Sequence, residues 1–105
     1  MEAGYLAIDP VRRTVTRDRT GIELTRSEFN LLAALMRSAG LCVSRQSLMQ
    51  SVWGSHASVG QGALDVLVNS LRGKIDAPFQ QKLVQTVRGS GYLLDCGTRQ
   101  MEKAS

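Results

Sequence analysis

The feature that most limits the fold of this chain is a periodic stripe of large apolar residues in its second half. These residues recur at intervals of four, three and four positions, as Leu64, Val68, Leu71 and Ile75. Because an α-helix turns once in about 3.6 residues, the spacing predicts a helix with one buried face. The opposite face carries polar side chains at the same spacing, namely Asp65, Asn69, Arg72 and Asp76. Such a helix suits the major groove of DNA, whereas a solvated surface is the ordinary alternative for an isolated helix.

An earlier helix is predicted from a local signal at its start. Thr25 and Glu28 have the spacing of a capping box, in which each side chain bonds the backbone of the other residue. Apolar residues follow at helical intervals from Phe29 to Met36. Gly40 is expected at the C′ position, just past the end of this helix, where a left-handed conformation favours glycine.

A short helix is expected between these two. Ser44 is a good N-cap for a helix over residues 45–52. Residues 55–62 are small and polar, so they are expected to form a loop. The third helix is therefore expected to begin near Ala63.

Short β-type segments flank the helices on both sides. The apolar segments before the helices are residues 5–9, 14–17 and 21–24. Turn residues separate them, which predicts an antiparallel sheet. After the helices, residues 83–87 and 92–94 flank a turn with two glycines, which predicts a hairpin. The fold class is therefore α+β, with three strands, three helices and a hairpin in that order.

The length and charge of the chain favour one domain with a polyanionic partner. The 105 residues are enough for one core, expected over residues 1–96. The polar tail over residues 97–105 is expected to be disordered. A net charge of +4 and a pI near 9.6 favour a nucleic acid only weakly, because the basic residues are spread along the chain.

The composition also indicates a cytoplasmic protein. No stretch approaches the roughly 20 apolar residues of a membrane span, and the first residues do not resemble a signal peptide. No membrane partner is expected. Cys42 and Cys96 are two thiols far apart in the sequence, so they are expected to be reduced.

No catalytic site, metal site or cofactor is expected. His56 is the only histidine, and no further ligands lie at metal-binding spacing. Ser, His and Asp residues occur without the strained turn that presents a nucleophile. Gly89-Ser90-Gly91 does not continue into a phosphate-binding loop.

Four blocks of the sequence carry a resemblance to a known family. They are residues 24–35 (LTRSEFNLLAAL), 43–54 (VSRQSLMQSVWG), 64–75 (LDVLVNSLRGKI) and 83–92 (LVQTVRGSGY). In this order and at these separations they resemble the OmpR/PhoB family of response-regulator effector domains. The resemblance runs from about Leu6 to Leu94. Residues 74–92 are similar to the heavy-metal-responsive branch of that family, which includes copper regulators.

The resemblance implies a winged helix-turn-helix fold and a set of partners. The second and third helices would form the helix-turn-helix, with the third as the recognition helix and the hairpin as the wing. Bacterial members regulate transcription by binding double-stranded DNA at direct repeats, as tandem head-to-tail dimers. Within a longer protein they act with a receiver domain and a sensor kinase. The loop between the second and third helices commonly contacts RNA polymerase.

The resemblance also implies which residues make these contacts. The residues expected to contact DNA are Trp53, Asp65, Val66, Leu67, Asn69, Ser70, Arg72, Lys74, Thr86 and Arg88. Among them, Thr86 would bond a phosphate and Arg88 would reach the minor groove. The residues of the expected polymerase loop are Ser55, His56, Ala57, Ser58, Val59, Gly60 and Gln61.

Several of these residues have a structural alternative. Arg72 could bond a phosphate or a guanine, or form a surface salt bridge with Asp76 four residues later. Val66 and Leu67 could touch thymine methyl groups or pack in the core. Trp53 is more often a core residue than a DNA contact.

The sequence departs from the family pattern at two positions, and this departure leaves a second function as an alternative hypothesis. Asn69 and Ser70 stand where relatives usually carry basic residues, and Lys74 restores part of the lost charge. Asn69 can recognise adenine through paired hydrogen bonds, and serine is unselective. The main hypothesis is sequence-specific DNA binding. The alternative is a winged-helix protein-protein interaction module that has lost DNA binding.

Overall fold

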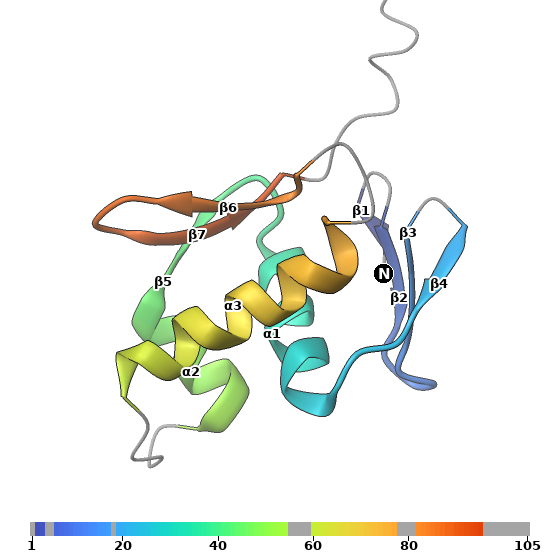
Figure 1. Cartoon of the computed structure of the whole chain (residues 1–105), viewed down its shortest axis with the longest axis horizontal. Coiled ribbons are helices and arrows are strands. Elements are labelled where there is room, and N and C mark those ends of the chain that lie inside the picture. Colours follow the sequence, from blue (N-terminus) through green and yellow to red (C-terminus); the bar gives the residue numbers. More distant parts are fainter. Residues whose placement is uncertain (1, 4–5, 18, 55–59, 78–81, 96–105) are drawn as a thin grey trace, which may run out of the picture.

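The computed structural model describes residues 2–3, 6–17, 19–54, 60–77 and 82–95 (Figure 1). Its elements are β1 (Glu2–Ala3), β2 (Leu6–Asp9), β3 (Thr14–Arg17), β4 (Thr20–Ile22), α1 (Arg26–Arg37), β5 (Cys42–Ser44), α2 (Arg45–Trp53), α3 (Gln61–Ile75), β6 (Val84–Val87) and β7 (Gly91–Leu94). The α+β class and the predicted order of sheet, helices and hairpin are confirmed. The expected tail over residues 97–105 lies outside the described residues.

The N-terminal strands form an antiparallel sheet in the order β1-β2-β3-β4. Its alternating pattern points Leu6, Ile8 and Val15 into the core, and Ile8 faces Val15 across the ladder. The three predicted strands are confirmed within two residues at each end. The two-residue strand β1 was not predicted.

The capping box at the start of α1 is confirmed. The backbone N–H of Glu28 donates to Thr25 Oγ1 at 3.2 Å, and the N–H of Thr25 donates to Glu28 Oε1 at 2.9 Å. The prediction for the other end was wrong, because the C-cap is Ser38 and Gly40 lies two residues beyond it. Gly40 has a φ of +85°, and its N–H donates to the carbonyl of Leu94. This glycine therefore joins the turn after α1 to the last strand.

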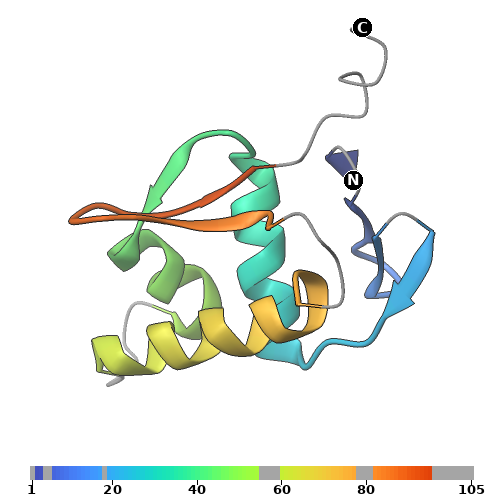
Figure 2. The same cartoon turned by 45° about the horizontal axis from the view of Figure 1, so that its top comes forward.

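The helices pack around α1, which lies between the two sheets (Figure 2). The apolar stripe of α3 is fully buried, as its spacing predicts, at Leu64, Val68, Leu71 and Ile75. Ser44 caps α2 as predicted, with its hydroxyl accepting from the N–H of Ser47. Helix α3 begins two residues earlier than expected. Gly60 is its N-cap and Gln61 its first residue, so Gln61 and Gly62 were wrongly assigned to the loop.

The C-terminal hairpin belongs to a three-stranded sheet in the order β5-β7-β6. Strand β5 was not predicted, and it pairs with β7 through Val43 opposite Tyr92 and Ser44 opposite Gly91. Strand β6 is therefore an edge strand, while β7 is held on both sides. The hairpin turn and the first turn of α3 lie toward the same end of the molecule (Figure 1).

We expect the contact between β5 and β7 to require glycine at position 91. A Cβ atom added to Gly91 would lie 2.0 Å from the carbonyl oxygen of Val43, so the two strands would have to separate. We expect Gly91→Ala to lower the free energy of unfolding by about 1–3 kcal/mol, the usual range for overpacking. Urea denaturation followed by circular dichroism measures this change.

Gly73→Ala is the matched control, because a Cβ there meets no atom within 4 Å and the residue lies inside α3. It should leave stability unchanged or raise it by up to about 1 kcal/mol through helix propensity. An unfolding midpoint for Gly91→Ala equal to that of the wild type would contradict the packing argument.

Candidate nucleic-acid interface

The outward face of α3 presents neutral side chains, among them Val66 and Asn69. Val66 is 70% exposed and Asn69 is exposed. Leu67 is half-buried and packs against the core, which favours its structural alternative. Trp53 at the end of α2 also packs against the core while remaining partly accessible. The side chains that α3 offers to a partner thus include Val66 and Asn69.

Asp65 on α3 is fastened to two other elements. It forms a 2.8 Å ion pair with Arg45 of α2, and it accepts a 2.5 Å hydrogen bond from the hydroxyl of Tyr92 on β7. The guanidinium carbon of Arg45 also lies 5.7 Å from the centre of the Tyr92 ring. The Tyr92 hydroxyl and Arg45 lower the pKa of Asp65, so the carboxylate stays charged. Burial, followed by the bond to Asp65, raises the pKa of Tyr92, which keeps its proton.

Arg72 reaches from α3 to the hairpin. Its Nε donates to the carbonyl of Val84 at 3.0 Å, and its Nη2 donates to Thr86 Oγ1 at 2.8 Å. Its guanidinium carbon lies 5.7 Å from the centre of the Tyr92 ring. The expected alternative for Arg72, a salt bridge with Asp76, is not the contact found, because Asp76 pairs with Arg17 instead.

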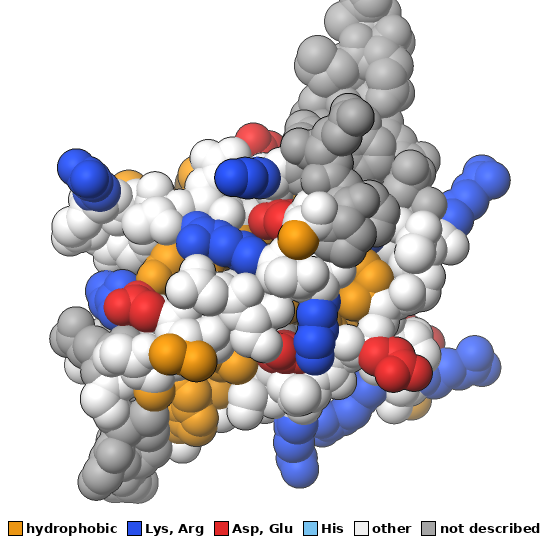
Figure 3. All heavy atoms as spheres, viewed as in Figure 1, with side chains coloured by type: hydrophobic (Ala, Val, Ile, Leu, Met, Phe, Trp, Pro, Cys, Tyr) orange, Lys and Arg blue, Asp and Glu red, His pale blue; other side chains and the backbone are white. Residues whose placement is uncertain are grey.

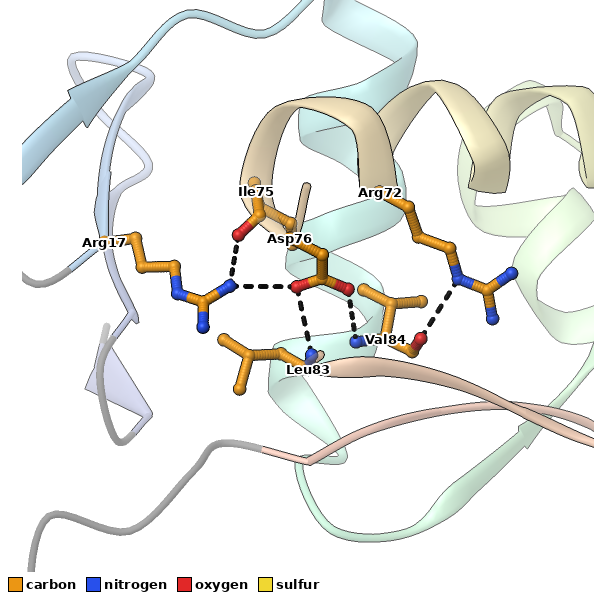
Figure 4. A network of polar contacts seen from close by, with 6 residues as sticks. All are labelled: Arg17, Arg72, Ile75, Asp76, Leu83 and Val84. Atoms are coloured by element: carbon orange, nitrogen blue, oxygen red, sulfur yellow. Dashed lines mark hydrogen bonds and ion pairs between the residues drawn. The ribbon is translucent and has the colours of Figure 1, made fainter. Parts of the chain in front are cut away.

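Asp76 was predicted on the polar face of α3, and that prediction was wrong. The residue is the C-cap of α3 and only 4% exposed, because Arg17 and the start of the hairpin pack against it. Arg17 Nη1 donates to Asp76 Oδ1 at 3.0 Å and also to the carbonyl of Ile75 (Figure 4). The two carboxylate oxygens of Asp76 accept from the backbone N–H groups of Leu83, at 3.0 Å, and Val84, at 3.1 Å.

Ser70 and Lys74 of α3 are engaged with the start of α1. Lys74 Nζ lies 2.7 Å from Glu28 Oε1, and the Ser70 hydroxyl donates to Glu28 Oε2. The Glu28 side chain is 2% exposed, and burial alone would raise its pKa. Hydrogen bonds from Lys74, Ser70 and the Thr25 backbone outweigh burial and lower the pKa to about 2. The charge of Lys74 is therefore balanced within the protein.

The hairpin carries exposed polar side chains beside α3. Thr86 on β6 and Arg88 in the turn are both exposed, and Gly89 adopts a φ of +75° in that turn. A groove runs between the second half of α3 and β6, and Arg72, Lys82, Gln85 and Thr86 contribute to its walls. Sequence reasoning missed Lys82, although a basic residue directly before a predicted wing strand was the available signal.

Basic side chains are spread over this face of the molecule and do not form one patch (Figure 3).

Within the described residues, no group of three or more His, Cys, Asp or Glu side chains could hold a metal ion. Likewise, no helix in the described part of the chain is both long and apolar enough to cross a membrane. Cys42 is exposed with a free thiol. Residues 55–59 of the expected polymerase loop, and Cys96, lie outside the described part of the chain.

The sequence matches the family "Transcriptional regulatory protein, C terminal" over residues 18–94. This chain belongs to that family, the winged helix effector domains of OmpR/PhoB-type response regulators. The transcriptional regulatory protein CusR of Escherichia coli is 46% identical over 90 residues, which are 86% of this chain and 40% of CusR. HprR of the same organism is 39% identical over 92 residues, which are 88% of this chain and 41% of HprR.

Solved structures of two DNA-binding domains resemble this chain over nearly its whole length. The DNA-binding domain of Klebsiella pneumoniae RstA, in complex with the RstA box, has a TM-score of 0.79 at 30% identity, covering 92% of this chain and 97% of that chain. The DNA-binding domain of Escherichia coli CpxR has a TM-score of 0.77 at 33% identity, with the same two coverages. The chain spans about two fifths of the length of the curated relatives described above.

The low pKa of Glu28 predicts a loss of stability in acid. The folded pKa is about 2 and the ordinary value is 4.5, so the stabilisation is complete above that ordinary value and is lost as the pH falls toward 2. At about 1.4 kcal/mol per pKa unit, the loss is roughly 3 kcal/mol. Glu28→Gln should be less stable at neutral pH and should lose less stability across this acid range.

Urea denaturation at several pH values tests this prediction. Glu23→Gln, which changes an exposed carboxylate before α1, is the matched control and should follow the wild-type pH profile. Parallel profiles for the wild type and Glu28→Gln would show that Glu28 does not supply the acid-sensitive stability.

Proposed function

We propose that this chain binds double-stranded DNA at specific sequences and regulates transcription as the output domain of a response regulator. One observation carries the proposal: exposed Val66 and Asn69 on α3 lie in the same fold as an exposed wing arginine, Arg88. A helix in the major groove and an arginine in the adjacent minor groove form a common two-point mode of binding. The RstA domain, which shares this fold, was solved in complex with the RstA box.

In this proposal α3 supplies the contacts to bases. Asn69 offers both a donor and an acceptor to adenine, and Val66 packs against a thymine methyl group. Ser70, Asp65 and Lys74 were also expected to contact DNA, but each has a partner within the protein. We therefore assign base recognition mainly to Asn69 and Val66.

The wing supplies affinity. Arg88 is charged and exposed, so it suits the enhanced negative potential of a narrow minor groove. Thr86 is exposed beside the groove between α3 and β6, where it would bond a phosphate. Lys82 lines the same groove and adds positive charge there.

The proposal also includes the cellular location of the chain and its protein partners. We place the chain in the cytoplasm of a bacterium, attached to a receiver domain that a sensor kinase controls. Residues 55–59, between α2 and α3, would contact RNA polymerase. The likeness of residues 74–92 to the heavy-metal-responsive branch stays a prediction. The alternative, a protein-interaction module without DNA binding, predicts no salt-dependent association with DNA.

Binding to genomic DNA fragments tests the function itself. In gel shifts at low salt, we expect selective binding that weakens steeply as salt rises, because cationic side chains release counterions from DNA. Footprints of the selected fragments should show two direct half-sites about 10–10.5 base pairs apart, from tandem binding. Equal binding to all fragments, or saturation of a single half-site by one molecule, would contradict the specific or the tandem part of the proposal.

Two substitutions separate the roles of α3 and the wing. Asn69→Ala should cost about 1–3 kcal/mol on the best site and much less on scrambled DNA, because a neutral side chain contributes only base recognition. Arg88→Ala should weaken both complexes and make the salt dependence shallower by about one unit of slope, because it removes one cation. Fluorescence anisotropy against salt measures both variants. An equal loss on both DNAs for Asn69→Ala would move base recognition to Val66 or another neighbour.

A further inference from the structure

We infer that Arg72 is a positioning residue that fixes the wing on α3, so that its effect on DNA binding passes through Arg88. The inference rests on the proposed function, because it assigns a means of orienting the same site. It also replaces the role of a direct DNA contact that the family resemblance implied for Arg72.

Arg72 bonds two residues of strand β6, the second of which lies nearer the hairpin turn. Its Nε bonds the carbonyl of Val84, a residue only 2% exposed near the base of the hairpin. Its Nη2 bonds the side chain of Thr86, which is exposed and two residues farther along the strand. Arg88 follows two residues after Thr86. The Arg72 guanidinium therefore bonds β6 at two residues, Val84 and Thr86, that lie four and two positions before Arg88.

Strand β6 depends on such support because it is the edge strand of its sheet. β7 lies between β5 and β6, whereas, among the strands described, β6 pairs with β7 alone. At the base of the hairpin, Asp76 holds the N–H groups of Leu83 and Val84. Farther out, among the contacts described, Arg72 is the α3 side chain that bonds β6. Arg72 thus holds the outer part of β6 directly, in addition to the bond between Asp65 of α3 and Tyr92, which lies opposite Thr86 on β7.

The geometry of these bonds requires a guanidinium. Nε and Nη2 belong to one rigid planar group, so the Val84 carbonyl and the Thr86 hydroxyl can be bonded together. The same group lies 5.7 Å from the centre of the Tyr92 ring on β7, so it touches both strands of the hairpin. A lysine at this position keeps the charge but cannot reproduce the paired bonds. Arg72→Lys therefore removes the bonds that position β6 while it keeps the positive charge at residue 72.

The first experiment needs no DNA. Amide relaxation by NMR should show larger motions at residues 86–90 in Arg72→Lys than in the wild type, with unchanged values in α1. Arg12→Lys, at an exposed position in the turn between β2 and β3, is the matched control and should change neither region. Unchanged motions in the hairpin of Arg72→Lys would overturn the inference. This readout is independent of whether the chain binds DNA, so it distinguishes failure of this inference from failure of the proposed function.

The second experiment is a double-mutant cycle on a DNA site with an A·T-rich minor groove at the wing. We expect Arg72→Lys to weaken binding about tenfold when Arg88 is present and less than about twofold in the Arg88→Ala background, because coupled residues are not additive. An equal loss in both backgrounds would show that Arg72 acts independently of Arg88, and the inference would then fail.

Discussion

The carboxylate of Asp76 connects three parts of this molecule through buried polar bonds. It is 4% exposed, and it bonds Arg17 of β3 and the first two N–H groups of the hairpin segment (Figure 4). Arg17 is itself 3% exposed and also bonds the last carbonyl of α3. Removing one member of a buried pair leaves an uncompensated charge, which is far costlier than losing a surface salt bridge. The N-terminal sheet, α3 and the hairpin are therefore fixed relative to one another at one point.

The charged residues of α3 are largely used to hold this arrangement together. Asp65 bonds Tyr92 and Arg45, Arg72 bonds β6, and Lys74 balances the buried Glu28. What remains on the outward face of α3 is mainly neutral. In the proposed function, such a helix would provide shape and hydrogen bonds for base recognition, while the wing and the basic residues nearby would supply attraction to phosphates. The proposed division would suit Asn69 and Ser70, which stand where the family resemblance implies basic residues.

Sequence reasoning located the elements whose signals are local. The capping box at Thr25, the N-cap at Ser44 and the glycine-rich hairpin turn each depend on a few neighbouring residues, and all three are confirmed. The failures involve partners that are distant in the sequence. Strand β5 has three residues and is defined by its pairing with β7. Asp76 fits the polar spacing of α3, and nothing nearby shows that Arg17, 59 positions earlier, will bury it. The Arg72 contacts were missed for the same reason.

Asp76 holds α3 and the base of the hairpin together as one rigid unit. Native-state hydrogen exchange tests this claim most directly, at the amides of Leu83 and Val84 that donate to the Asp76 carboxylate. Since these bonds are buried, both amides should exchange only through global unfolding, with the same opening free energy as the core amides of α1. Exchange of these two amides through a local opening, at a free energy well below that of α1, would contradict the claim.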